Sequence, residues 1–224
     1  MDNILGVKID NLSRKEILSR VESFLLDENF HQIATVNPEF ILQAQEDAEF
    51  KEILNGCDLN VADGTGVWFA YLRFGKLLKC RMTGIDLMVE VLRIANRKNM
   101  KVFLATKEGG LSNFKEIKDA ILKTHPNLEI EGNDISSCDI VFSALGSPVQ
   151  EKFLNSLKND KIKLAMGIGG SFDYLTKKII RAPRWMRRIG LEWVFRLILE
   201  PRYRFKRIFN AVIIFPIKII LNKK

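Results

Sequence analysis

Charged and polar residues follow the apolar runs of this sequence, at places where side chains often do chemistry. Asp63 stands between an apolar run and a glycine-rich loop. Its carboxylate could take part in catalysis in a cleft, or it could only stabilise the turn. Thr35 and Asn37 follow another apolar run, and Asn37 could bind a ligand or only cap the helix that Pro38 would begin.

Two further groups could bind an anion. Arg81 precedes the start of a predicted helix, where its guanidinium could reach a bound anion or remain a solvated surface group. Gly167, Gly169 and Gly170 follow an apolar run and could bring backbone N–H groups close to a phosphate. Their spacing lacks the dinucleotide fingerprint, because Asp173 stands where the third glycine would be. A nucleotide-dependent oxidoreductase therefore has weak support.

Metal-binding patterns are absent from the sequence. There is no Asp-x-Asp pair, and the three cysteines and two histidines are isolated. We therefore expect neither a disulfide nor a zinc cluster. We also expect no cofactor and no metal, and if the substrate is a diphosphate, we expect cationic side chains to take the place of a metal ion.

Alternating strand and helix patterns must position these residues. Short apolar runs predict strands, at residues 6–9, 32–36, 59–61, 101–105, 139–144 and 163–168. Segments of helical period lie between them, at residues 14–26, 38–55, 85–98, 111–124 and 149–158. Such alternation predicts an α/β fold with a parallel sheet covered by helices. Ligands bind at the carboxyl ends of the strands in such sheets, where the candidate residues stand.

The segment from Lys177 to Lys224 is far more basic than the rest of the chain. It contains 14 Lys or Arg and two acidic residues, so its net charge is +12, whereas the whole chain carries +8 and the preceding residues sum to −4. We therefore divide the chain into a body, residues 1–176, and a basic, amphipathic helical appendage, residues 177–224. At 224 residues, one domain with an extension is expected.

The appendage is also aromatic and apolar, which decides among its possible partners. Cations interleaved with rings and aliphatic residues suit an anionic membrane surface. Packing in the core or against a subunit is a second interpretation, and nucleic acid is a third. Base stacking gives little reason for Val212, Ile213 and Ile214, so we favour the membrane and expect no nucleic acid. Arg204 and Arg207 stand three residues apart and would share one helical face.

The N-terminal residues and the apolar run near the C-terminus predict where in the cell the protein lies. The N-terminal residues lack the pattern of a secretory signal, so we expect a cytoplasmic protein. The apolar run at residues 209–221 is too short to span a bilayer. We expect it to lie on the inner face of the cell membrane as a peripheral segment.

Several motifs in order and spacing resemble the WecG/TagA/CpsF family of bacterial glycosyltransferases. They are the segments Thr35-Val-Asn-Pro-Glu39, Ala62-Asp-Gly-x-Gly66, Arg81-x-x-Gly84-x-Asp-Leu87, Leu145-Gly-x-Pro-x-Gln-Glu151, Gly167-x-Gly-Gly-Ser-Phe-Asp173, Arg181-Ala-Pro-Arg-Trp185 and Gly190-Leu-Glu-Trp193. The segment Ala105-Thr-Lys-Glu108 departs from the family pattern, in which a glycine often follows the strand directly. This departure leaves the nucleotide contacts there open.

The resemblance implies a Rossmann-like body, a UDP-sugar donor, a polyprenyl-diphosphate-linked acceptor and inversion at the sugar carbon, without a metal. It places the donor near Thr35, Asn37, Gly84 and Gln150, and Glu151 of the same motif is a further candidate. It makes Asp63 the base. The leaving diphosphate would be stabilised by Arg81, and the candidates for the acceptor diphosphate or the membrane are the appendage residues Arg202, Arg204 and Arg207.

The resemblance favours N-acetylmannosamine as the transferred sugar, as in the teichoic acid linkage unit. Its uronic acid and other UDP-sugars remain alternatives within the family. A nucleic-acid-binding α/β protein is the alternative of another class. A homo-oligomer also remains possible on sequence grounds.

Overall fold

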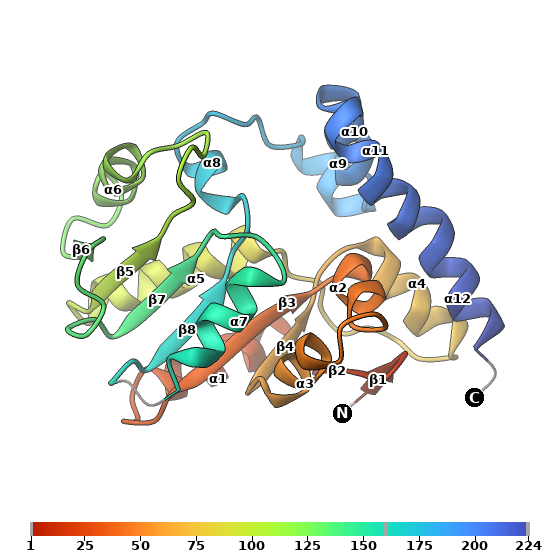
Figure 1. Cartoon of the computed structure of the whole chain (residues 1–224), viewed down its shortest axis with the longest axis horizontal. Coiled ribbons are helices and arrows are strands. Elements are labelled where there is room, and N and C mark those ends of the chain that lie inside the picture. The colour runs from red at the N-terminus through yellow and green to blue at the C-terminus, as the bar shows by residue number, and fades with distance from the viewer. Residues whose placement is uncertain (1, 159–160, 223–224) are drawn as a thin grey trace.

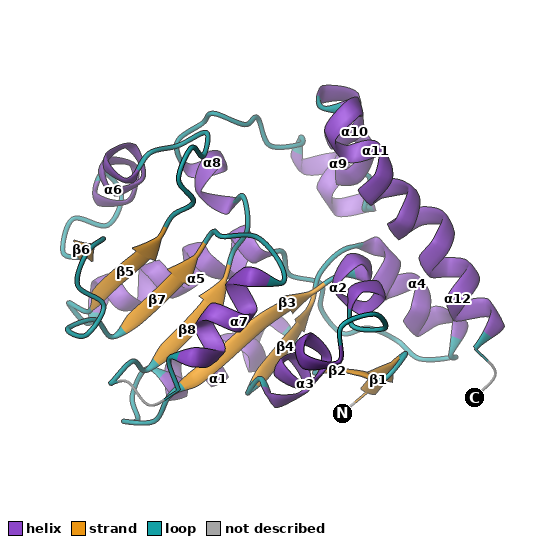
Figure 2. Ribbon diagram, in the orientation of Figure 1, coloured by secondary structure: helices purple, strands orange, loops and turns teal. Residues whose placement is uncertain are grey.

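A single parallel sheet organises the protein. The computed structural model describes residues 2–158 and 161–222, so the outer ends of the predicted body and appendage lie outside it. Six parallel strands are arranged in the order β4-β3-β8-β7-β5-β6 (Figure 2). Their bounds are β3 His31–Val36, β4 Leu59–Ala62, β5 Lys101–Ala105, β6 Glu129–Glu131, β7 Ile140–Ser143 and β8 Leu164–Gly167. The predicted α/β fold is confirmed.

Helices cover both faces of this sheet because strand side chains alternate between them. On one face, Ile33, Phe142 and Met166 join a core with α1 (Arg14–Phe24), α5 (Gly84–Arg97) and α6 (Phe114–Leu122). On the other, Ala34 and the neighbouring strands pack against α2 (Pro38–Gln43), α3 (Ala48–Gly56), α4 (Thr65–Arg73) and α7 (Val149–Ser156). Figure 1 shows α3 and α7 on the near face and α1 and α5 behind the sheet.

Local sequence accounts for the helix starts. Ser13 and Glu16 form the capping box that begins α1. The predicted helix at residues 38–55 is two helices, because Asp47 accepts a hydrogen bond from the backbone of Phe50 and caps α3 anew.

Several elements differ from the sequence-based expectation, among them the N-terminal hairpin, one edge strand and one helix. The predicted strand at residues 6–9 does not join the parallel sheet; β2 (Val7–Ile9) pairs with β1 (Asp2–Ile4) in a separate antiparallel sheet. The edge strand β6 was not predicted, because it has three residues, two of them glutamate. Helix α4 was not predicted either, since its glycine-containing start is typical of a loop.

The residues after β8 form a series of helices. They are α8 (Ser171–Leu175), α9 (Arg184–Ile189), α10 (Glu192–Leu199), α11 (Pro201–Phe209), the π-helical stretch η1 (Asn210–Ile214) and α12 (Phe215–Leu221). The last three run as one continuous rod along α4 and α2 (Figure 1). None of the helices described is both long and apolar enough to cross a membrane.

The C-terminal end of this rod, helix α12, packs into the hydrophobic core. The side chains of Phe215 and Ile219 are fully buried and pack in one cluster with Val67, Ala70 and Tyr71 of α4. The predicted appendage is therefore anchored to the body at its distal end. Its membrane role remains a prediction. The residues that could contact a membrane are the exposed ones on the rest of the rod.

Candidate active site

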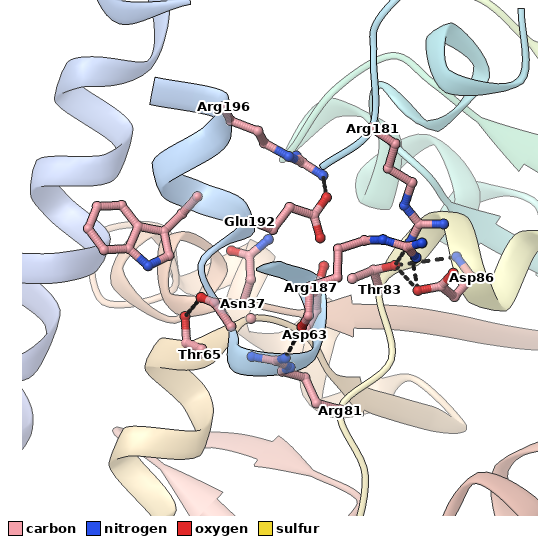
Figure 3. A pocket seen from close by; sticks show the side chains of 13 residues that line it. Asn37, Asp63, Thr65, Arg81, Thr83, Asp86, Arg181, Arg187, Glu192 and Arg196 are labelled. Atoms are coloured by element: carbon pink, nitrogen blue, oxygen red, sulfur yellow. Dashed lines mark hydrogen bonds and ion pairs between the residues drawn. The ribbon is translucent and has the colours of Figure 1, made fainter. Parts of the chain in front are cut away.

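A cavity of about 240 Å³ opens where the carboxyl ends of β3 and β4 face the segment after α8. Its lining comes from the body and from the predicted appendage, residues 177–224, which is called the C-terminal segment below. The lining residues are Asn37, Asp63, Gly64, Thr65, Arg81, Thr83, Asp86, Arg181, Arg187, Gly190, Glu192, Trp193 and Arg196. Figure 3 shows these side chains converging from both sides. Strand ends of a parallel sheet are the expected place for a ligand.

Asp63 is the first residue after β4 and lies within this cavity. Its backbone N–H donates to the carbonyl of Val36 at 2.8 Å, which fixes it beside the end of β3. Burial raises the pKa of its carboxyl to about 7; Glu192 and Asp86 add to this effect, while Arg196 and Arg81 oppose it. A carboxyl with this pKa can accept a proton near neutral pH.

Asn37 caps its helix and also lines the cavity. Its Oδ1 accepts a hydrogen bond from the backbone N–H of Phe40 at 3.0 Å and so caps α2. The same side chain lines the cavity near Asp63. Capping holds Asn37 in place at the cavity edge.

Arg81 joins the body to the C-terminal segment. Its Nη2 donates to the backbone carbonyl of Arg187 at 2.8 Å, at the end of α9. Close by, Thr65 Oγ1 donates to the carbonyl of Gly190 at 3.3 Å. The C-terminal segment therefore forms one wall of the cavity through contacts with backbone atoms.

Two ion pairs neutralise part of the charge in the cavity. Arg181 Nη2 lies 2.7 Å from Asp86 Oδ2, and Arg196 Nη2 lies 2.6 Å from Glu192 Oε1. Burial alone would raise the pKa of Asp86, but hydrogen bonds from Arg181 and Thr83 lower it overall. Asp86 is therefore held as an anion by its partners.

Thr35 and Gly84 meet beneath the cavity and are not part of its lining. Thr35 is buried at the end of β3, and a Cβ placed on Gly84 would lie 3.2 Å from Thr35 Oγ1. The missing side chain at Gly84 lets the start of α5 approach the end of β3. Their predicted contact with the donor remains a prediction.

Gln150 and Glu151 are buried beneath the loop after β8. Gln150 Nε2 donates to Glu151 Oε1 at 2.6 Å, and Gln150 Oε1 accepts from the backbone N–H of Gly169 at 3.1 Å. Burial raises the pKa of Glu151 to about 7, against the lowering effect of the Gln150 hydrogen bond. The pair supports the loop rather than lining the described cavity, and its predicted role in donor binding is untested.

The predicted arginines of α11 lie outside the cavity lining. Arg207 donates to both carboxylate oxygens of Glu39 on α2, at 2.9 and 2.6 Å. Arg204 pairs with Glu200 one helical turn away, at 2.5 Å. Arg202 is exposed at the start of α11. The roles predicted for these three residues at a diphosphate or a membrane remain predictions.

Comparison with known proteins identifies the family. The model of the glycosyl transferase WecG/TagA/CpsF family matches residues 2–135 and 134–224. The chain belongs to this family. It is similar to proteins named N-acetylglucosaminyldiphosphoundecaprenol N-acetyl-beta-D-mannosaminyltransferase. The one from Bacillus subtilis (strain 168) is 30% identical over 93% of this chain and 87% of its own length. The one from Staphylococcus aureus (strain MRSA252) is 30% identical over 99% and 93%.

This member of the WecG/TagA/CpsF family is therefore a glycosyltransferase. Of the site residues predicted from sequence, Asp63, Arg81 and Asn37 line the cavity. Several other lining residues were not predicted from the sequence, namely Thr65, Thr83, Asp86, Arg181, Arg187, Glu192, Trp193 and Arg196. Asp86, Arg181, Glu192 and Trp193 are specified positions of the motifs quoted for the family resemblance, which was the available signal.

Charge in this glycosyltransferase cavity comes from arginines and carboxylates. Across the described residues, no three His, Cys, Asp or Glu side chains gather in a way that could hold a metal ion. The cavity combines one carboxyl that can exchange a proton near neutral pH with guanidinium groups that can bind phosphate oxygens.

Proposed function

We propose that this glycosyltransferase moves N-acetylmannosamine from UDP-N-acetylmannosamine to N-acetylglucosamine linked to undecaprenyl diphosphate, in synthesis of the wall teichoic acid linkage unit. The acceptor and the sugar are those in the names of the similar proteins from B. subtilis and S. aureus. The observation that carries the proposal is the placement of Asp63 among arginines in the cavity at the strand ends.

Asp63 acts as the base in this reaction. Its carboxylate takes the proton from the acceptor hydroxyl as that oxygen attacks the anomeric carbon of the donor sugar. The bond from that carbon to the UDP oxygen breaks on the opposite face, so the configuration inverts. A single displacement of this kind requires one base and no covalent intermediate on the enzyme.

Guanidinium groups stabilise the departing UDP. Negative charge develops on its diphosphate as the sugar leaves, and fixed cations that point at this charge lower the barrier. Arg81 lines the cavity beside Asp63 and is suited to this role. We propose that arginines supply this charge without a metal ion, which an assay with chelator tests directly.

The outer surface of the C-terminal segment supports binding to the membrane that holds the acceptor. Large apolar side chains are exposed along it, at Trp185, Ile189, Ile198, Phe205, Phe209, Ile213, Ile217 and Ile220. The same segment carries exposed cations, among them Arg184, Arg202 and Lys206. Apolar residues beside cations suit the interface of an anionic leaflet. We place the enzyme on the inner face of the cell membrane.

The decisive experiment is acceptor-dependent release of UDP. The purified full-length chain is incubated in detergent with UDP-N-acetylmannosamine and lipid-diphosphate-linked N-acetylglucosamine, with chelator throughout. We expect release only when the acceptor is present. Release with a different UDP-sugar would correct the donor, whereas release that requires added metal would overturn the proposed role of the arginines.

Membrane binding has its own test. Vesicles containing anionic lipid should carry the full-length protein upward on flotation, and high salt should weaken but not abolish binding, since screening leaves the apolar contribution. Binding that ignores both salt and lipid charge would contradict the proposal. Salt-sensitive binding to RNA without binding to vesicles would instead support a nucleic-acid-binding protein.

A further inference from the structure

Arg187 is a cavity residue that forms no ion pair of its own in the described parts of the chain. Two of the four cavity arginines form the ion pairs described above. Arg81 and Arg187 pair with no carboxylate in the described parts of the chain. Asp63 is the remaining acidic group of the lining, so guanidinium groups exceed carboxylates. A partly desolvated surplus of positive charge suits an anionic ligand.

Local contacts hold the Arg187 side chain across the cavity. Its Nε donates to the backbone carbonyl of Ala182 at 3.1 Å. Its two terminal nitrogens donate no hydrogen bond to any residue that the structure describes. Figure 3 shows the side chain reaching toward Thr83 and Asp86. The lowered pKa of Asp86 includes a contribution from Arg187, which agrees with this direction.

Arg81 and Arg187 come from different walls of the cavity, since Arg81 precedes α5 in the body and Arg187 belongs to α9. The proposed reaction brings two diphosphate groups to the enzyme, one in UDP and one in the lipid-linked acceptor. A single arginine serves two such groups less well than two arginines on different walls.

We propose that Arg187 binds a diphosphate group in the cavity, as a second guanidinium contact in addition to Arg81. The proposal rests on the proposed function, which supplies the two sources of diphosphate. The planar guanidinium presents paired N–H groups that match phosphate oxygens. Losing a hydrogen bond to a charged group of this kind weakens binding by about tenfold to a hundredfold.

The test uses the full-length protein with Arg187→Gln and a matched control, Arg188→Gln. Arg188 is the next residue of α9, carries the same charge and is exposed. UDP and inorganic pyrophosphate affinities are measured by calorimetry, and the KM for the lipid-diphosphate acceptor comes from UDP release. Thermal unfolding checks the fold of each variant. If Arg187→Gln does not fold, Arg187→Met, which keeps an apolar stem, takes its place.

Comparing UDP affinity with the acceptor KM shows which of the two diphosphate groups Arg187 binds. Weaker UDP binding in the Arg187 variant alone assigns the donor diphosphate, whereas a higher acceptor KM alone assigns the lipid diphosphate. Behaviour equal to that of the Arg188 control for all three ligands would overturn the proposal. If wild type binds UDP or pyrophosphate but shows no acceptor-dependent release, the proposed function fails while the binding comparison still decides the role of Arg187.

Discussion

Gly190 packs directly against Thr65, and this contact joins the C-terminal segment to the body beside the cavity. A Cβ placed on Gly190 would lie 2.1 Å from Thr65 Cγ2, well inside the contact distance of two carbons. The residue also has φ of +81°, in the left-handed region that ends α9. Both features require glycine at this position.

Replacing Gly190 should disturb the cavity. Gly190→Ala must shift the segment after α9, because the new methyl group would also lie 2.8 Å from Arg81 Nη1. We expect UDP release to fall at least tenfold, as displacements of about 1 Å near a reacting group often do. Gly75→Ala is the matched control, since Gly75 has φ of +68° and no neighbour within 4 Å of a Cβ. Equal activity of the two variants would show that the contact between Gly190 and Thr65 is not needed for activity.

Removing the proposed base should abolish most turnover. Asp63→Asn should lower turnover by about 10² to 10⁴-fold and leave UDP binding intact. In wild type, turnover should rise with pH through about 7, because a base must be unprotonated and the pKa of Asp63 is about 7. Asp58→Asn, at the opposite end of β4, is the control and should keep its activity. A near-normal rate in Asp63→Asn would remove this residue from the role.

The same substitution should stabilise the protein at high pH. The pKa of Asp63 is about 7 when folded and ordinarily about 4 in an unfolded chain. Between these values the folded state binds more protons, so the contribution of Asp63 to stability is present below pH 4 and is lost as pH rises through 7. The difference in Tm between Asp63→Asn and wild type should therefore be larger at pH 8 than at pH 5. A difference that shrinks with pH would contradict the raised pKa.

Two adjacent isoleucines of α12 should behave differently. Ile219 is fully buried, whereas Ile220 is 50% exposed. Ile219→Ala should lower the free energy of unfolding by about 2 to 5 kcal/mol, and Ile220→Ala by less than about 0.5 kcal/mol. Denaturant unfolding measures both. Vesicle flotation should show the reverse order, with the larger loss for Ile220→Ala. Similar unfolding energies would contradict packing of the rod into the core.

The ion pair between Arg207 and Glu39 should help to hold the rod against α2. Its side chains are 46% and 36% exposed, so we expect a coupling energy of about 0.5 kcal/mol in a double-mutant cycle. Glu39→Arg and Arg207→Glu should each lower the Tm, and the double variant should recover most of the loss. The exposed pair of Arg97 with Glu22, which joins α5 to α1, provides a comparison away from the cavity.

Periodicity predicted the body of the fold because its elements are built from local patterns. Five of the six strands of the parallel sheet, namely β3, β4, β5, β7 and β8, lie where their apolar runs stand. The pattern at residues 6–9 was equally strand-like, but pairing with β1 depends on a hairpin that periodicity does not encode. Helix α4 escaped prediction because its start contains glycine and because its exposed face includes the apolar residues Trp68 and Leu72, so the sequence lacks a clear polar face.

The site was only partly predictable for a different reason. Asp63, Asn37 and Arg81 each follow or precede an element, so their position can be deduced from the general geometry of parallel sheets. The opposite wall depends on contacts such as Arg81 with Arg187, which are 106 residues apart in the chain. No local pattern encodes such a pairing. The role of the C-terminal segment as a cavity wall therefore required the structure.

Burial of Phe215 and Ile219 against α4 has a consequence for biosynthesis. Helix α4 leaves the ribosome long before α12 has been translated, so Val67, Ala70 and Tyr71 lack their final cover until α12 emerges. Nascent chains with uncovered apolar surface are prone to aggregate and are bound by chaperones. The cavity likewise assembles only after its opposite wall, which is made by residues between Arg181 and Arg196, has been translated.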